Sequence, residues 1–252
     1  MAFMSWFGYT FIAFGPSLAI FTMTIADDAT QIIIMFTSAF FWLVSLLFSS
    51  IIWQIPFSDL KLRLGISVAL CVAIQELFRY LFYLLMKKAD KGLLSITTSS
   101  TISQTRQRKH KIAYVAGFGF GVMSGAFSVV NLLATASGPG TVGIKGNSDL
   151  FFLSSAIFTS IFILLNIFWS VIIFDGFDKR NWKKIAYVFA THELTSLLTL
   201  VNVGHQPNYS ASITTSCLVL LITTIVALYT AGGNIKSLIT SLVKRQVVTQ
   251  VR

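Results

Sequence analysis

The chain has 252 residues, of which 55% are hydrophobic and only 11% are charged, and its formal net charge at pH 7 is +10. A soluble domain usually contains about 25% charged residues, so this composition excludes a water-soluble globular protein and favours a polytopic membrane protein. The basic excess does not indicate nucleic-acid binding, because Lys and Arg lie in short segments between apolar runs and form no basic domain.

Seven apolar segments follow one another, and each has about the length of a helix that crosses a bilayer. They cover residues 3–25, 31–54, 62–86, 112–136, 150–174, 185–203 and 210–231. The sixth is the shortest and contains polar residues. The sequence therefore predicts an all-α membrane protein with a single domain of seven transmembrane helices over residues 1–252.

The distribution of basic residues predicts the orientation of these helices, since Lys and Arg collect on the cytosolic side. With the N-terminus outside the cytosol, fifteen Lys and Arg face the cytosol, three lie outside, and Arg79 lies within a helix. We therefore expect a luminal or extracellular N-terminus and a cytosolic C-terminus. We also expect a mobile cytosolic loop at about residues 87–111 and a short cytosolic tail at about residues 232–252. The basic ends of the loop set the topology or contact anionic lipid heads.

Ionisable side chains within a spanning helix are costly and mark candidate functional sites. Gln75, Glu76 and Arg79 lie in the third apolar segment. Glu76 and Arg79 are three residues apart, share a helix face and can form an ion pair. Two interpretations stay open, namely a self-neutralising pair near a helix end and part of a site that faces the protein interior.

Small residues recur at every fourth position of the fourth segment, at Ala113, Gly117, Gly121 and Gly125. This spacing places them on one helix face and leaves a groove about 18 Å long. Lipid gains nothing from such a groove, whereas another helix can bring its backbone close. The strip is therefore predicted to be a helix-packing interface that accepts a partner helix.

Further polar residues lie in the later segments, with Asn131 in the fourth, Asn166 in the fifth, and His192 followed by Glu193 in the sixth. His192 is the strongest candidate for a special role, because an imidazole inside a bundle can hydrogen-bond across helices, relay protons or bind a metal. No metal site and no cofactor are expected, since neither Cys nor a second His accompanies it. We expect an interior polar pocket lined by Gln75, Glu76, Arg79, Asn131, Asn166 and His192.

Catalytic motifs are scarce. Each of the seven aspartates falls in a predicted loop or at a predicted helix end, so no pair of carboxylates at membrane depth is available for an aspartyl protease. The sequence contains neither a Gly-x-Ser-x-Gly turn nor a His-Glu-x-x-His motif,. The remaining catalytic option is a glutamate–histidine site built from Glu76, Asn166 and His192.

Several short motifs occur along the chain in a fixed order. They are residues 7–16, residues 40–47, Gln75-Glu76 with Phe78-Arg79 and Lys87-Lys88-Ala89, residues 113–115 with the glycines at 117, 121 and 125, residues 137–143, Phe168-Trp169, Phe174-Asp175, His192 and residues 231–233. In this ordered set the chain resembles the anterior-pharynx-defective subunit of γ-secretase over essentially its whole length.

The resemblance implies a seven-helix scaffold in a membrane-embedded protease complex that processes Notch and the amyloid precursor protein. It implies presenilin, which supplies the catalytic aspartates, nicastrin and the small presenilin-enhancer subunit as partners, with membrane lipid as the surroundings. It implies the endoplasmic reticulum, Golgi, plasma membrane and endosomes as locations, and a role in assembly for Gly117, Gly121 and Gly125. The family has two intramembrane histidines; His192 matches one, and Asn166 stands at the place of the other.

Two alternatives stay open. A fainter likeness to intramembrane glutamate proteases, in which Glu76, Asn166 and His192 match incomplete motifs, leaves a stand-alone or degenerate glutamate protease as the second hypothesis. A transporter or seven-helix receptor is the third, although the sequence shows no inverted repeat and few charges within its apolar segments.

Overall fold

The computed structural model describes residues 2–52, 60–94, 102–136, 150–202 and 208–233. Within these ranges the chain forms helices and no strands, which confirms the predicted all-α class. The helices are α1 (Ala2–Thr24), α2 (Ala29–Ile52), α3 (Leu60–Leu94), α4 (Ile102–Ala136), α5 (Leu150–Lys179), α6 (Trp182–Leu198), the 3₁₀ helix η1 (Thr199–Asn202) and α7 (Tyr209–Thr230).

The lengths of these helices fit a multi-pass membrane protein. Six of the described helices, all except α6 and η1, are long and apolar enough to cross a membrane. α6 has 17 residues, which is about 26 Å at 1.5 Å per residue. The 3₁₀ turn η1 follows it directly and lengthens it by four residues, about 8 Å. The seven crossings predicted from the sequence are therefore compatible with the helix lengths.

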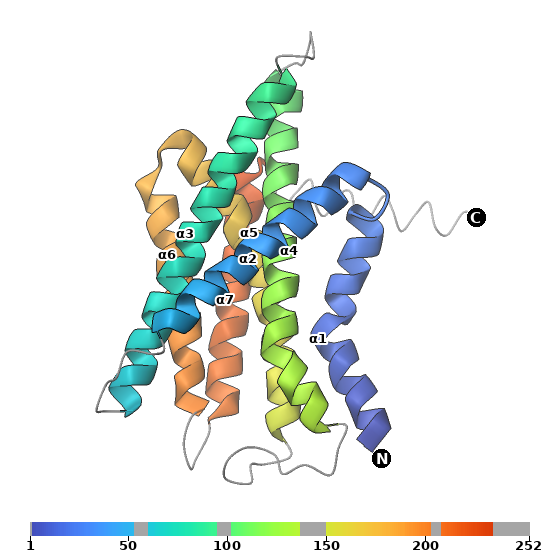
Figure 1. The fold of residues 1–252 in the computed structure, drawn as a ribbon, viewed down its shortest axis with the longest axis vertical. Helices are drawn as coiled ribbons and strands as arrows, with labels where there is room; N and C mark the ends of the chain where they lie inside the picture. Colours follow the sequence, from blue (N-terminus) through green and yellow to red (C-terminus); the bar gives the residue numbers. More distant parts are fainter. Residues whose placement is uncertain (1, 53–59, 95–101, 137–149, 203–207, 234–252) are drawn as a thin grey trace, which may run out of the picture.

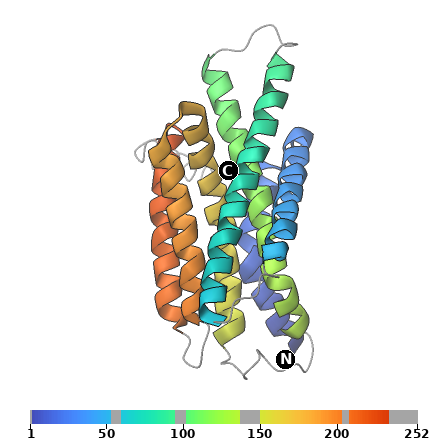
Figure 2. The same ribbon diagram turned by 60° about the vertical axis from the view of Figure 1, so that its left-hand side comes forward.

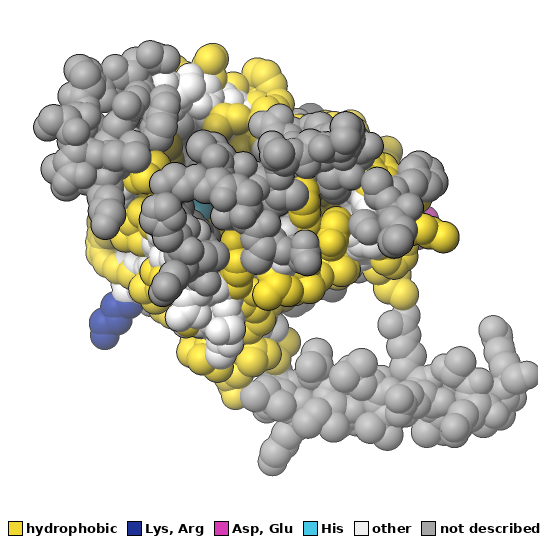
Figure 3. All heavy atoms as spheres, turned by 90° about the horizontal axis from the view of Figure 1, so that it is seen from below, with side chains coloured by type: hydrophobic (Ala, Val, Ile, Leu, Met, Phe, Trp, Pro, Cys, Tyr) yellow, Lys and Arg dark blue, Asp and Glu magenta, His cyan; other side chains and the backbone are white. Residues whose placement is uncertain are grey.

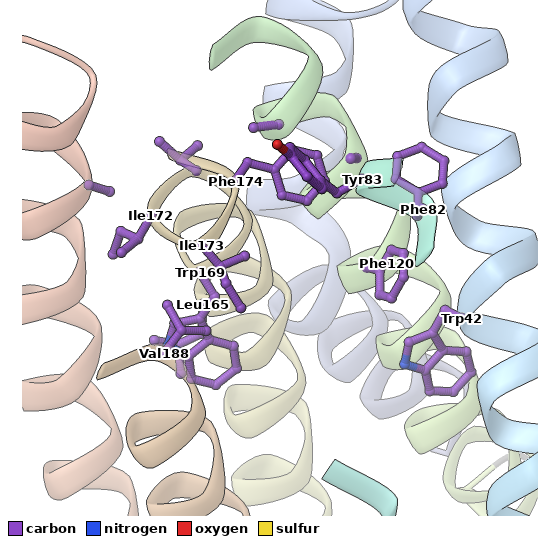
Figure 4. Packing of buried hydrophobic residues seen from close by; sticks show 14 of the residues in the cluster. Trp42, Phe82, Tyr83, Phe120, Leu165, Trp169, Ile172, Ile173, Phe174 and Val188 are labelled. Atoms are coloured by element: carbon purple, nitrogen blue, oxygen red, sulfur yellow. The ribbon is translucent and has the colours of Figure 1, made fainter. Parts of the chain in front are cut away.

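The helices form an elongated bundle in which α5 occupies the centre (Figures 1 and 2). α5 packs against α1, α4, α6 and α7, while α4 also packs against α2, and α3 against α2 and α6. The main apolar core joins α2, α3, α4, α5, α6 and α7 and contains large side chains such as Trp42, Phe82, Phe120 and Trp169 (Figure 4). Most large side chains on the outer faces are apolar too, for example Phe11 on α1, which is 72% exposed. Outer faces of this kind suit lipid as the solvent.

Charged residues gather at one end of the bundle. This end carries the α1–α2 turn, the end of α3, the start of α4 and the α5–α6 turn, and it lies opposite the N-terminus (Figure 1). Among the described residues, four ion pairs link the elements there, namely Asp28–Lys111, Asp90–Arg108, Asp178–Lys109 and Asp175–Lys184, and Asp175–Lys179 lies within α5. Seen from the opposite end, the described side chains are mostly hydrophobic (Figure 3). The asymmetry agrees with basic residues on one side of the membrane.

Most of the described residues in the loop predicted at 87–111 are helical, so the prediction of a loop there is largely wrong. α3 continues to Leu94 and α4 already begins at Ile102, which leaves only residues 95–101 outside the described part. Lys, Ala, Leu, Gln and Arg dominate both extensions and favour helix even where the chain has left the apolar region. The Asp90–Arg108 ion pair also joins the two extensions. The predicted tail lies outside the described residues from position 234 onward.

Candidate functional site

The glycine strip of α4 packs directly on the backbone of α5. A Cβ atom added to Gly117 would lie 2.5 Å from the carbonyl oxygen of Asn166, and one added to Gly121 would lie 2.7 Å from that of Ile163. A Cβ atom added to Gly125 would lie 2.7 Å from Cδ1 of Ile163. At Gly117 and Gly121 contacts this short leave no room for a side chain, so the two helix backbones meet there, whereas Gly125 meets side chains of α5,.

The helix that fills the strip therefore belongs to this chain. The expectation that the strip accepts a helix of another subunit is corrected, while Gly117, Gly121 and Gly125 do form a helix-packing interface. Ala113, one turn before Gly117, is buried as well. The spacing could not reveal this, because small residues recruit a neighbour from the same chain as readily as one from another.

Gly119 serves a second contact that the four-residue spacing does not include. A Cβ atom there would overlap with the Met35 carbonyl oxygen and with Ser38 of α2. Glycines on two faces of α4 therefore let α2 and α5 approach from different sides. This explains why α4 is the most glycine-rich helix of the described chain.

Behind this interface, Arg79 reaches from α3 to α5 through fully buried hydrogen bonds. Its Nη1 donates to the Ser170 hydroxyl (2.8 Å) and to the Asn166 backbone carbonyl (3.2 Å), and its Nη2 donates to Asn166 Oδ1 (2.6 Å). Its Nε lies 3.3 Å from Oε2 of Glu76. The Asn166 amide donates in turn to the carbonyl of Phe162, 2.9 Å away. One guanidinium thus fixes α3 against α5.

His192 connects α6 to the same group. Its Nδ1 lies 2.7 Å from Oε1 of Glu76. With Glu76 ionised opposite Arg79, this contact assigns the proton to Nδ1 of His192, because an ionised carboxylate can only accept hydrogen bonds. The imidazole also stacks on Trp169 with 4.3 Å between ring centroids, and the Trp169 indole donates to the Thr191 hydroxyl (3.0 Å). We call Glu76, Arg79, Asn166, Ser170 and His192 the interior polar cluster.

The interior polar cluster is close to electrically balanced. Arg79 and Glu76 have side-chain exposures of only 1% and 7%, and the guanidinium also lies 5.2 Å from the centroid of the Phe120 ring on α4. A buried ion pair of this kind adds little net stability over an apolar core, but removing one partner leaves an uncompensated charge. The cluster therefore specifies how α3, α5 and α6 meet.

The arrangement offers little for catalysis. Oε1 of Glu76 is hydrogen-bonded to His192, and Oε2 is closed to solvent and lies 3.3 Å from Nε of Arg79 without forming a hydrogen bond. Among the described residues, no three His, Cys, Asp or Glu side chains are close enough together to hold a metal ion. The interior polar cluster links helices to one another through hydrogen bonds.

Of the six residues predicted to line an interior pocket, the structure brings Glu76, Arg79, Asn166 and His192 into contact. Gln75 is half-buried and lies outside their hydrogen bonds. Asn131 belongs to α4, but its side chain is not among the described ones. The sequence analysis missed Ser170, although its place one helical turn after Asn166 was a usable signal.

Comparisons with known proteins agree with this architecture. The model of the family described as Aph-1 protein matches residues 4–234. Gamma-secretase subunit APH-1B of Mus musculus is 43% identical over 242 residues, which cover 92% of this chain and 90% of the mouse protein. Gamma-secretase subunit Aph-1 of Drosophila melanogaster is 43% identical over 237 residues (94% and 97%). Gamma-secretase subunit APH1-like of Arabidopsis thaliana is 34% identical over 207 residues (79% and 82%). The chain therefore belongs to the Aph-1 protein family.

Proposed function

We propose that this chain is a non-catalytic scaffold subunit of a γ-secretase complex, and that it stabilises presenilin and nicastrin through helix packing in the membrane. The observation that carries this proposal is the near end-to-end match to relatives that are named gamma-secretase subunits. The small presenilin-enhancer subunit completes the expected assembly. The expected locations are the endoplasmic reticulum, Golgi, plasma membrane and endosomes.

The geometry supports a scaffold rather than a protease. Asp28, Asp90, Asp175 and Asp178 all form ion pairs at the charged end of the bundle. An aspartyl protease instead needs two carboxylates that share one proton at the scissile bond. Glu76 is only 7% exposed and its Oε2 is closed to solvent, whereas a general base needs a lone pair directed at a water molecule. The stand-alone glutamate protease is therefore not favoured.

A scaffold of this kind must bind its partners with its outer faces. The glycine strip is filled by α5, and the interior polar cluster is enclosed by α3, α5 and α6. The described helices still expose apolar side chains to the outside, and α1 exposes most of its surface. We infer that the internal contacts make the bundle rigid and that the outer helix faces bind neighbouring subunits.

Co-purification tests this function. The full chain, carrying an affinity tag, is expressed in animal cells and isolated in a mild detergent, and its partners are identified by mass spectrometry. We expect presenilin, nicastrin and the presenilin-enhancer subunit in comparable amounts. Recovery of the chain without them contradicts the proposal. So does proteolysis by the isolated chain that Glu76→Gln abolishes.

A further inference from the structure

Two carboxylates lie beside the turn between α5 and α6, and both already have basic partners. Asp175, whose side chain is 5% exposed, pairs with Lys179 (2.7 Å) and Lys184 (2.6 Å). Asp178 pairs with Lys109 of α4 (2.9 Å) and also accepts a hydrogen bond from α3. Each carboxylate therefore has both oxygens engaged, and neither is left for a further basic residue of this turn.

Arg180 and Lys183 are the basic residues that remain at the turn. Both are exposed, and neither forms an ion pair within the described part of the chain. Trp182 lies between them in the sequence and is 77% exposed. We call Arg180, Trp182 and Lys183 the basic turn. It presents two uncompensated cations and an indole ring to the surroundings of the bundle.

The backbone of the basic turn favours other residues than those present. Arg180 directly follows α5 and has φ 51°, the single positive φ at a non-glycine residue among the described ones. Glycine or asparagine normally occupies such a position, because the Cβ atom of other residues is crowded there. The first turn of α6 contains Lys183 but no acidic residue, although the positive end of a helix dipole favours an anion. Residues that oppose local preference in this way are typical of functional sites.

The depth of the basic turn in the membrane indicates which anion it meets. Exposed tryptophan at the end of a membrane helix typically lies at the level of the lipid headgroups. The turn belongs to the end of the bundle that carries the ion pairs, which is predicted to face the cytosol (Figure 1). Cytosolic leaflets contain anionic phospholipids, and these attract Lys and Arg close to the surface. The anion within reach of the basic turn is therefore a phospholipid headgroup.

We propose that the basic turn binds the headgroup of an anionic phospholipid. The Arg180 guanidinium can donate two parallel N–H bonds to phosphate oxygens, and the Lys183 ammonium adds a second positive charge. The Trp182 indole has an apolar body and a polar tip, so it packs against the lipid where the headgroup joins the acyl chains. All three residues belong to this chain, so the site is complete without another subunit.

Lipid titration tests the site. The full chain is purified in a mild detergent and titrated with phosphatidylserine or phosphatidylcholine, and native mass spectrometry counts the bound lipids. We expect the first phosphatidylserine to bind at least about fivefold more tightly than phosphatidylcholine, which is the effect of about one basic residue near an anionic surface. Arg180→Gln/Lys183→Gln should remove this preference.

Lys109→Gln/Lys111→Gln is the matched control. It removes two charges from the same end of the bundle, but from lysines that already pair with aspartates, so the preference for phosphatidylserine should remain. Equal losses in the two double variants would show a response to net charge alone and overturn the inference. Absence of the preference in the wild-type chain overturns it as well.

Arg180→Gly separates lipid binding from folding. Glycine adopts a positive φ readily, so this variant should unfold in detergent at the wild-type temperature or above it, and yet bind phosphatidylserine more weakly. Unchanged binding by Arg180→Gly overturns the inference. Brominated phosphatidylserine should quench tryptophan fluorescence more than brominated phosphatidylcholine does, and this excess should disappear in Trp182→Phe. An equal excess in Trp182→Phe places the lipid elsewhere and also overturns the inference.

Discussion

Arg79 holds the most demanding position in the bundle, with a full positive charge and 1% exposure. We expect Arg79→Met to destabilise the isolated chain by about 3–5 kcal/mol, because Glu76 would keep its charge without a counterion. The double variant Glu76→Gln/Arg79→Met removes both charges and should cost less than the single variant. Thermal unfolding in detergent measures all three proteins.

Arg108 provides the matched control. It also pairs with an aspartate, Asp90, but its side chain is 36% exposed at the charged end of the bundle. Exposed ion pairs contribute about 0–1 kcal/mol, so Arg108→Met should have a small effect. If Arg79→Met and Arg108→Met lower the unfolding temperature equally, the interior polar cluster does not hold α3, α5 and α6 together as described above.

The sequence predicted which residues belong to the interior polar cluster better than it predicted the contacts between them. Glu76 and Arg79 can pair because three residues separate them on one helix, and the sequence leaves open a self-neutralising pair or part of an interior site. Asn166 and His192 were singled out because polar residues are rare in apolar segments. Their meeting point depends on which helices are neighbours, and seven segments allow many arrangements. The bond from Arg79 to the Asn166 backbone carbonyl had no side-chain signal at all.

Among the helices, α4 makes the sharpest demand on residue size. Gly121→Ala should destabilise the chain, because the added Cβ atom would lie 2.7 Å from the Ile163 carbonyl oxygen and α5 would have to move away. An overpacked interior typically costs about 1–3 kcal/mol. Thermal unfolding of the isolated chain measures the loss before any partner is involved.

Gly65 of α3 provides the control for this substitution. A Cβ atom there meets nothing within 4 Å, so Gly65→Ala should be neutral or stabilising by up to about 1 kcal/mol. Equal effects of Gly65→Ala and Gly121→Ala would show that the α4–α5 contact tolerates a side chain. In that case the glycine strip of α4 could bind a helix of another subunit.

The contacts of Asp28, at the start of α2, predict that the stability of the chain depends on pH. Asp28 accepts from the Thr30 backbone N–H (3.0 Å) and the Gln31 amide (2.9 Å), and it pairs with Lys111 of α4. The Gln31 hydrogen bond, helped by Lys111 and Thr30, holds the pKa of the Asp28 carboxyl below its usual value. Its stabilising contribution is therefore complete above the ordinary carboxyl pKa and is lost as the pH falls through the lowered one.

Asp28→Asn isolates this contribution. The variant should unfold at a lower temperature than the wild-type chain near pH 6, and the two should converge as the pH approaches about 2. Thermal unfolding across this range measures the difference between the proteins. A difference that stays constant with pH would mean that the carboxylate charge at position 28 contributes nothing.

For the elements, hydropathy predicted helix number and approximate position, because about twenty apolar residues in a row have few alternatives to a spanning helix. It failed where helices leave the apolar region. Lys87 and Lys88 were assigned to a loop, yet α3 continues through them to Leu94. Hydropathy measures affinity for lipid, whereas helix propensity and ion pairs such as Asp90–Arg108 decide how far a helix extends into water.

The predicted helices of the whole molecule cross the membrane in alternating directions, and this leads to a prediction about the sides on which the termini lie. The N-terminus lies opposite the end that carries the ion pairs (Figure 1), and fifteen of the 19 Lys and Arg belong to segments predicted to lie in the cytosol. We expect a glycosylation sequon added at the N-terminus to be glycosylated in cells and one added after Arg252 to stay unmodified. Gel mobility before and after glycosidase treatment measures both.

This experiment also decides whether α6 crosses the membrane. An odd number of crossings places the two ends on opposite sides, whereas an α6 that fails to span would place them on the same side. The Glu76–His192 contact needs α6 to enter the bundle as far as the middle of α3, and η1 supplies the remaining length toward the other end. Equal modification of both added sequons would mean that the insertion of α6 stops short of the far side of the membrane.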